Sequence, residues 1–286
     1  MIYDILGEQN MKKQWMIASS FLFLSSLLCG CTGGETSEEK KGYEVEVTSI
    51  VCKDQRKIYA EIYRPVDFKG EAPAIVMSHG YSVDHKDVAL NAQYFSEQGF
   101  ICVTFDYCGG SLTSKSDGKF EDMTIETEYD DLDEVVHYTM NLEDVNEEKM
   151  ILFGCSQGGF MSTLYASENL DIIDGLLLFY PSFCIPEKAV NGTSAAKGEK
   201  YNEVAKKYAP VENILEKVKD LPILIFHGNK DTTVDLHYSQ DAMKIFQNAE
   251  LVVIDGANHG FNMYKMGEVL VNEINPKAYE FLNQLK

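Results

Sequence analysis

The sequence predicts an α/β domain in which helices flank a mostly parallel sheet of eight strands. Short apolar runs recur along the chain and alternate with longer segments of helical periodicity, the order that gives parallel strands joined by helices. The first two strand-like segments alternate polar and apolar residues instead, which predicts an antiparallel hairpin at one edge of the sheet. In mid-chain, Gly154-Cys155-Ser156-Gln157-Gly158 joins an apolar run to a helical segment, as a tight turn between a buried strand and a helix would.

Composition indicates a folded protein and excludes two classes of partner. A chain of 286 residues is long enough for one large domain. Hydrophobic residues at 45% and aromatic residues at 11% exclude a disordered chain. The formal net charge of −20 leaves no basic excess to neutralise phosphates. We therefore expect no binding to nucleic acid, and no binding to anionic membrane surfaces through charge.

The N-terminal region has the pattern of an export signal. A basic pair at positions 12–13 precedes residues 15–28, which are uncharged, largely apolar and too few for a membrane-spanning helix. Asp4 and Glu8 lie ahead of the basic pair and do not fit such a signal. We therefore expect translation to start at Met11.

The end of this signal, predicted as residues 1–31, resembles the lipid-attachment site of bacterial lipoproteins. Cys31 is the predicted lipid-bearing residue because a small residue precedes it, whereas a leucine precedes Cys29. Residues 32–42 are small, polar and charged, as in a flexible tether. We expect an exported protein, anchored by lipid alone on the extracytoplasmic side of the bacterial cell membrane. Cleavage nearby as an ordinary secretory signal is the alternative.

The globular domain is predicted to span residues 43–286 and to begin with the hairpin. Residues 43–50 and 57–63 alternate in polarity, a polar turn separates them, and Pro65 stops the second strand. The next elements are a buried strand at 74–78, a helix at 88–98 closed by Gly99, a strand at 100–105, a helix at 124–140 and a strand at 150–153.

The second half continues this alternation and contains one insertion. After the turn we predict a helix at 159–166, strands at 171–180, 222–226 and 250–254, and helices at 236–247 and up to Leu285. Between residue 184 and about residue 220, Lys, Glu, Ala, Asn and Gly dominate, with weak helical patterns at 201–208 and 211–219.

The cysteines of the domain do not indicate a metal site, because their spacing matches no zinc-binding pattern. They are Cys52, Cys102, Cys108, Cys155 and Cys184. Since their number is odd, at least one stays a thiol. We expect mostly free, buried side chains, and a disulfide among them is left open.

The segment around Ser156 resembles the nucleophile elbow of the α/β-hydrolase family, a Gly-x-Ser-x-Gly turn between a strand and a helix. Glycine is needed at positions 154 and 158 because neighbouring backbone crowds the turn, which projects the serine hydroxyl above the sheet edge. The resemblance implies an α/β-hydrolase fold over about residues 43–286. It makes the insertion at about 184–220 a short lid and Ser156 the nucleophile.

Two later segments supply the partners that this family places after the nucleophile. Residues 227–231, His-Gly-Asn-Lys-Asp, follow a strand and match the family's acid motif, so Asp231 is the predicted acid. The rival, Asp235, fits better as the N-cap of the following helix. His259 follows the last strand, ahead of a Gly-Phe pair, and is the predicted base. Serine, acid and histidine thus occur in the order that this fold requires.

A third resemblance concerns the loop His79-Gly80-Tyr81, which follows the strand at 74–78. In the family, such a loop supplies one backbone N–H of the oxyanion hole, and the residue after the nucleophile supplies the other. The donors here would be the N–H groups of Tyr81 and Gln157. We expect His79 to brace the loop rather than to transfer protons.

Within the family, the chain most resembles bacterial cinnamoyl and feruloyl esterase-like enzymes. The likeness rests on the His-Gly-aromatic loop, the Ser-Gln-Gly turn, the segment 116–122 and the small insertion. Cys155 departs from it, because such esterases usually carry histidine there. The resemblance implies hydrolysis of small-molecule carboxylic esters through an acyl-enzyme, with no metal and no organic cofactor.

Two alternatives remain, and the oligomeric state stays open. One is a serine peptidase of the same fold, although such peptidases often carry an added propeller domain for which this chain has no room. The other is a surface lipoprotein that kept the fold without the activity.

Overall fold

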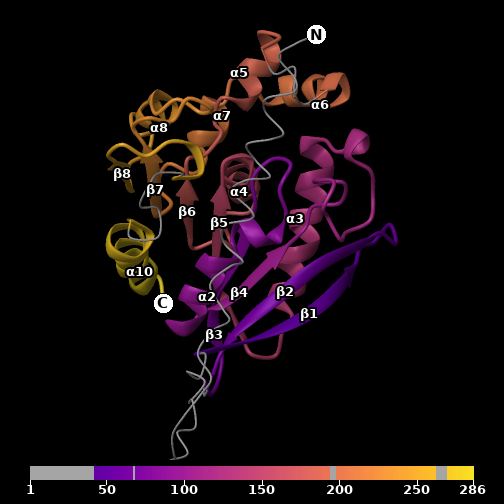
Figure 1. Cartoon of the computed structure of the whole chain (residues 1–286), viewed down its shortest axis with the longest axis vertical. Helices are drawn as coiled ribbons and strands as arrows, with labels where there is room; N and C mark the ends of the chain where they lie inside the picture. Colours follow the sequence, from indigo (N-terminus) through magenta and orange to yellow (C-terminus); the bar gives the residue numbers. More distant parts are fainter. Residues whose placement is uncertain (1–41, 67, 194–197, 262–268) are drawn as a thin grey trace, which may run out of the picture. The chain divides into compact units, whose positions relative to one another are not determined.

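An eight-stranded sheet lies at the centre of the domain, in the order β1-β2-β4-β3-β5-β6-β7-β8. The computed structural model describes residues 42–286, apart from residue 67 and the segments 194–197 and 262–268 (Figure 1). The predicted signal, Cys31 and the tether up to residue 41 lie outside the described residues. Within the described part, no helix is long and apolar enough to span a bilayer.

The sheet has the predicted mixture of strand directions. The strands are β1 (Tyr43–Val51), β2 (Lys57–Pro65), β3 (Ala72–Ser78), β4 (Ile101–Phe105), β5 (Val145–Cys155), β6 (Gly175–Phe179), β7 (Ile223–Gly228) and β8 (Ala249–Ile254). β2 pairs antiparallel with both β1 and β4, and the remaining pairs are parallel. The expected α/β-hydrolase sheet with an N-terminal hairpin at its edge is therefore confirmed (Figure 1).

Helices and short helical turns connect these strands. They are η1 (His85–Asp87), α2 (Ala89–Glu97), η2 (Phe120–Asp122), α3 (Ile125–Met140), α4 (Gln157–Glu168), α5 (Ile185–Val190), α6 (Gly198–Ala205), η4 (Lys206–Tyr208), α7 (Glu212–Leu215), α8 (His237–Ala242), η5 (His259–Phe261), η6 (Leu270–Ile274) and α10 (Asn275–Gln284). Elements α5 to α7 occupy the predicted lid insertion.

Alternate residues of the central strands face two separate layers of helices. In β3, Ile75 packs into a core that contains Phe95 of α2 and Leu282 of α10. Its neighbour Val76 packs into the other core, which contains Leu132 of α3 and side chains of α4. Because both faces of the sheet are covered, the parallel strands are continuously apolar, as their sequences indicated. All five cysteines of the domain are buried, and Cys52, Cys102, Cys108 and Cys155 are free thiols.

Some elements differ from the prediction: β5, for example, begins at Val145 rather than at residue 150, and α7 ends at Leu215 rather than at residue 219. Residues 171–174 precede β6 rather than extending it, because Asp174 turns back to accept a hydrogen bond from the N–H of Met150. Helix α8 ends at Ala242 instead of residue 247, because the N–H groups of Gln247 and Asn248 bond to the carbonyl of Lys219. The short helix α5 was not predicted.

Candidate active site

The nucleophile elbow lies between β5 and α4, at the carboxyl edge of the sheet. Ser156 has φ 52° and ψ −115°, a conformation that is strained for a residue with a side chain. A Cβ at Gly154 would overlap the carbonyl oxygen of Gly158, and a Cβ at Gly158 would overlap that of Ser78. The two glycines are therefore required by the close approach of neighbouring backbone, as the motif predicted.

The three predicted catalytic side chains form a continuous hydrogen-bonded chain. Oγ of Ser156 lies 3.0 Å from Nε2 of His259, and Nδ1 of His259 lies 2.7 Å from Oδ2 of Asp231. The other oxygen of Asp231 accepts hydrogen bonds from the N–H groups of Thr233 and Val234, both at 2.9 Å. Ser156 follows β5, Asp231 follows β7 and His259 follows β8, so parallel strands bring their three ends to one place.

The environment of Asp231 keeps its carboxyl group ionised. Burial acts to raise its pKa, but hydrogen bonds from His227 and His259 and from the N–H of Val234 outweigh burial, and the pKa lies well below its usual range. An ionised carboxylate only accepts hydrogen bonds, so Nδ1 of His259 carries the hydrogen. Nε2 is thereby left to accept the hydroxyl hydrogen of Ser156.

Ionised Asp231 is expected to stabilise the folded protein at neutral pH. A carboxyl group with a lower pKa in the folded state contributes stability above its unfolded value of about 3.9, and this contribution is lost as the pH falls through the folded value. The loss in free energy of unfolding caused by Asp231→Asn should therefore be largest near neutral pH and shrink below about pH 4. Urea unfolding across this range measures it, and a loss independent of pH would contradict the assignment.

Two further side chains contact the site, and the sequence patterns did not identify them. Tyr180 has φ 40°, and its ring packs edge-on against the ring of His259, with 4.7 Å between centroids. Oγ of Ser182 lies 3.1 Å from Oγ of Ser156. Both residues follow β6, which lies between β5, the strand before Ser156, and β7, the strand before Asp231. This position in the order of strands was the one sequence feature that could have placed them at the site.

The predicted oxyanion loop lies beside the nucleophile. A Cβ built on Gly80 would be 3.5 Å from Cβ of Ser156. Gln157 is the first residue of α4, so its N–H has no acceptor within the helix. Nδ1 of His79 lies 2.7 Å from the carbonyl of Gly80, and Nε2 accepts a hydrogen bond from the N–H of Tyr107. Burial lowers the pKa of His79, so this histidine is a neutral brace, as expected.

A buried carboxylate connects the predicted lid with Gln157, the residue after Ser156. Glu128, in the first turn of α3, accepts a hydrogen bond at 2.5 Å from Nε2 of Gln157. The hydroxyl of Tyr201, on lid helix α6, donates to the other oxygen of Glu128 over 3.5 Å. All three side chains are buried. This contact could not be predicted, because an acidic residue in the first turn of a helix is already explained by its favourable interaction with the helix dipole.

Replacing Glu128 with alanine is expected to lower the free energy of unfolding by about 1–3 kcal/mol, because the buried amide of Gln157 loses its acceptor. It should also speed hydrogen exchange in α6, since Tyr201 loses its hydrogen bond to α3. The matched control is Glu126→Ala, in the same turn, whose exposed carboxylate pairs with Lys207 of η4 at 2.8 Å. Equal effects of the two substitutions would contradict a special role for Glu128.

The remaining acidic groups near the sheet edge have structural roles. Asp235, the rival acid, is exposed and accepts a hydrogen bond from the N–H of His237 at the start of α8. The carboxylate that bonds to Nδ1 of His259 is that of Asp231. The N-cap position of α8 is occupied by Leu236 rather than by Asp235, which precedes it and bonds to the first N–H of the helix.

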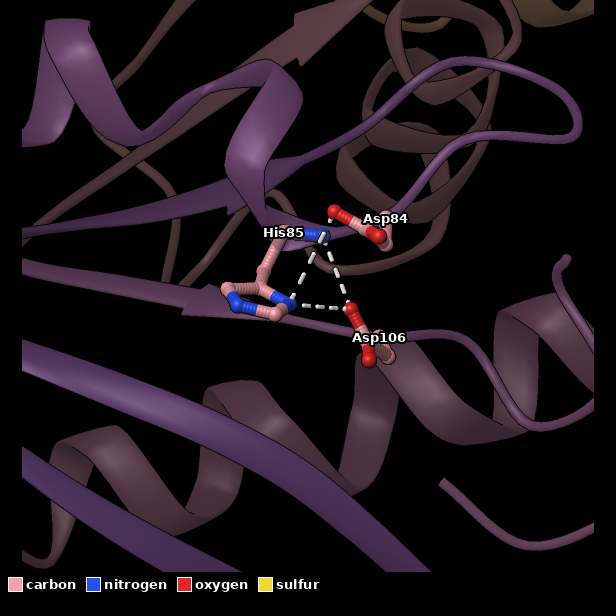
Figure 2. A group of neighbouring side chains, drawn as sticks. All are labelled: Asp84, His85 and Asp106. Atoms are coloured by element: carbon pink, nitrogen blue, oxygen red, sulfur yellow. Dashed lines mark hydrogen bonds and ion pairs between the residues drawn. The ribbon is translucent and has the colours of Figure 1, made fainter. Parts of the chain in front are cut away.

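Asp84, His85 and Asp106 form the one group of described residues with the spacing of a metal site (Figure 2). Nδ1 of His85 and its backbone N–H both lie 2.7 Å from Oδ1 of Asp106. The second ring nitrogen lies 3.2 Å from the carboxylate of Glu61. Because both ring nitrogens are directed at carboxylates, the group ties the loop after β3 to the end of β4, and we assign no metal to it.

Comparison with known proteins identifies relatives of this fold. Residues 86–284 match the profile of the prolyl oligopeptidase family. Est1E from Butyrivibrio proteoclasticus, solved with bound ferulic acid, is 26% identical, with a TM-score of 0.73 over 83% of this chain and 98% of that chain. No curated protein sequence gives a match.

More distant structures share the fold alone. Acetyl xylan esterase 1 from a Thermoanaerobacterium species is 19% identical, with a TM-score of 0.64 over 88% of this chain and 86% of that chain. A putative dipeptidyl aminopeptidase IV from Bacteroides ovatus is 18% identical, with a TM-score of 0.71. The match covers 86% of this chain but 36% of the putative peptidase.

Proposed function

Because the chain belongs to the prolyl oligopeptidase family and has the fold of α/β-hydrolase esterases, we propose that it is a serine hydrolase that cleaves carboxylic esters through an acyl-enzyme. The observation that carries this proposal is the chain of hydrogen bonds from Oγ of Ser156 through His259 to Asp231. A hydroxyl that donates to a neutral imidazole, which in turn donates to a buried carboxylate, is the arrangement that makes serine nucleophilic.

In the proposed mechanism each group has one step. Ser156 attacks the ester carbonyl carbon while Nε2 of His259 takes the hydroxyl proton, and Asp231 stabilises the resulting imidazolium. The N–H groups of Tyr81 and Gln157 would hold the oxyanion, each such donor being worth about 2.7–4 kcal/mol. The tetrahedral intermediate then expels the alcohol, which receives the proton from His259. Water, activated by the same histidine, hydrolyses the acyl-enzyme and restores Ser156.

For the substrate, we propose small esters of aromatic acids of the feruloyl or cinnamoyl type. Two observations support this class. The sequence resembles such esterases in the oxyanion loop, the elbow and the segment 116–122. In addition, the 26% identical Est1E structure contains ferulic acid.

Peptide hydrolysis is the second candidate, and the family match favours it. The matched family is named for oligopeptidases, and the putative aminopeptidase from Bacteroides ovatus shares the fold. The same nucleophile, base and acid would serve an amide bond. We place ester hydrolysis first because the match covers 98% of Est1E, which was solved with bound ferulic acid, but 36% of the putative peptidase.

A substrate panel distinguishes the two candidates. The purified protein is incubated with p-nitrophenyl acetate, methyl ferulate and a dipeptide p-nitroanilide, and Ser156→Ala is run in parallel. We expect turnover of both esters, with methyl ferulate giving the higher kcat/KM, and little release of p-nitroaniline. Turnover of the anilide alone would favour the peptidase candidate over the esterase candidate. The absence of turnover with either ester would refute the esterase proposal.

We also propose that the protein is exported and held at the membrane by a lipid on Cys31, on the support of residues 11–31 alone. In a bacterial host, Cys31→Ala is expected to shift the protein from the membrane fraction to the soluble fraction. Cys29→Ala is the matched control and should stay with the membrane. Membrane retention of the Cys31 variant would contradict the assignment.

A further inference from the structure

A second serine hydroxyl contacts the proposed nucleophile from the turn after β6, a strand that is followed by none of the three proposed catalytic residues. We propose that Ser182 donates a hydrogen bond to Oγ of Ser156 and thereby takes part in acyl transfer. Its Oγ lies 3.1 Å from that of Ser156, and Ser182 is buried, with 6% of its surface exposed. The inference rests on the proposed function, because it concerns the reactivity of the same nucleophile.

The backbone fixes the two serines relative to each other. The N–H of Ser156 donates to the carbonyl of Phe179 at 2.9 Å, and the N–H of Ser182 donates to the carbonyl of Ser156 at 2.8 Å. Between them, Pro181 packs against Gly159 so closely that a Cβ there would lie 2.9 Å from the proline Cβ. The turn after β6 therefore holds the backbone of Ser182 next to that of Ser156.

The direction of this hydrogen bond follows from the rest of the chain. The hydroxyl of Ser156 has one hydrogen, and Oγ has two close partners, Nε2 of His259 at 3.0 Å and Oγ of Ser182 at 3.1 Å. Nδ1 of His259 carries its hydrogen toward Asp231, so Nε2 only accepts and the Ser156 hydrogen points at the histidine. The contact with Ser182 is then satisfied when Ser182 is the donor.

A donor at this place favours both halves of the reaction. When Ser156 gives its proton to His259, negative charge develops on Oγ until the bond to the acyl carbon is complete, and the Ser182 hydroxyl stabilises it. When water cleaves the acyl-enzyme, Oγ is the leaving atom and again gains negative charge before it is reprotonated by His259. In each step Ser182 keeps its own proton, and no further reactant is needed.

The test compares variants of Ser182 in the purified protein. Ser182→Ala removes the hydroxyl, and Ser182→Cys fills the same space with a weak donor. The matched control is Ser167→Ala, a buried serine on α4 whose hydroxyl bonds to the carbonyl of Leu164. For each we measure the second-order rate constant of labelling by a fluorophosphonate, with kcat and KM for p-nitrophenyl acetate.

Both Ser182 variants should be labelled about tenfold more slowly and show a similar fall in kcat, with KM within about twofold of wild type. The Ser167 variant should keep the wild-type rates. Labelling of Ser182→Ala at the wild-type rate would overturn the inference. Wild-type rates in Ser182→Cys would also overturn it, because the loss in Ser182→Ala would then come from the missing side-chain volume and not from the missing hydrogen bond. A wild-type protein that takes no label would instead overturn the proposed function and, with it, this role.

Discussion

Replacement of Ser156 by alanine is expected to lower kcat for ester hydrolysis by a factor on the order of 10⁵ to 10⁶. The variant lacks the atom that forms the acyl-enzyme. The residual rate would come from a water molecule positioned by the oxyanion donors. Initial rates with p-nitrophenyl acetate measure the loss.

The fold should survive this change, because the backbone of Ser156 is held by its hydrogen bonds with Phe179 and Ser182. The alanine variant should show the far-UV circular dichroism and melting temperature of the wild type to within a few degrees. Activity retained at a tenth of wild type or more would place the nucleophile elsewhere.

Replacement of Asp231 by asparagine is expected to lower kcat by a factor of about 10⁴. Asparagine can keep the oxygen that accepts from the N–H groups of Thr233 and Val234. Its NH₂ group would then face Nδ1 of His259, where the carboxylate oxygen now lies at 2.7 Å. An amide donor favours the histidine tautomer with its hydrogen on Nε2, which cannot take the proton of Ser156.

Asp235→Asn is the matched control, since Asp235 is exposed and four residues farther along the same loop. It should retain activity, because its carboxylate bonds to the N–H of His237 and not to His259. If kcat fell with Asp235→Asn and not with Asp231→Asn, Asp235 would be the acid that orients His259, and the assignment of Asp231 would be wrong.

The fold could be predicted from the sequence because each strand has a local signature. Continuous apolar runs such as residues 74–78 mark strands covered on both faces, and the alternation in 43–50 marks an edge strand, most of whose residues are exposed. The boundaries that failed depend on tertiary contacts. Helix α8 ends early because the chain beyond it bonds to Lys219, which lies in a different part of the sequence.

The residues of the candidate site likewise include some that the sequence predicts and some that depend on tertiary contacts. Ser156, Asp231 and His259 could be found because each follows a strand within a recognisable short motif, and the parallel sheet brings strand ends together. Ser182 and Glu128 stand in no such motif. Ser182 is identified by its contact with Oγ of Ser156, and Glu128 by its contact with the side-chain amide of Gln157 on a neighbouring helix. Both contacts join residues that are far apart in the sequence, so they can be found in the three-dimensional structure alone.

The most direct test of the proposed chemistry is to identify the residue that reacts. The purified protein is incubated with a fluorophosphonate, digested and analysed by mass spectrometry, with the Ser156→Ala variant beside it. We predict one label per chain, on the peptide that contains Ser156, and none on the variant. A wild-type protein without label, or a label on another serine that persists in the variant, would contradict the assignment of Ser156 as the nucleophile.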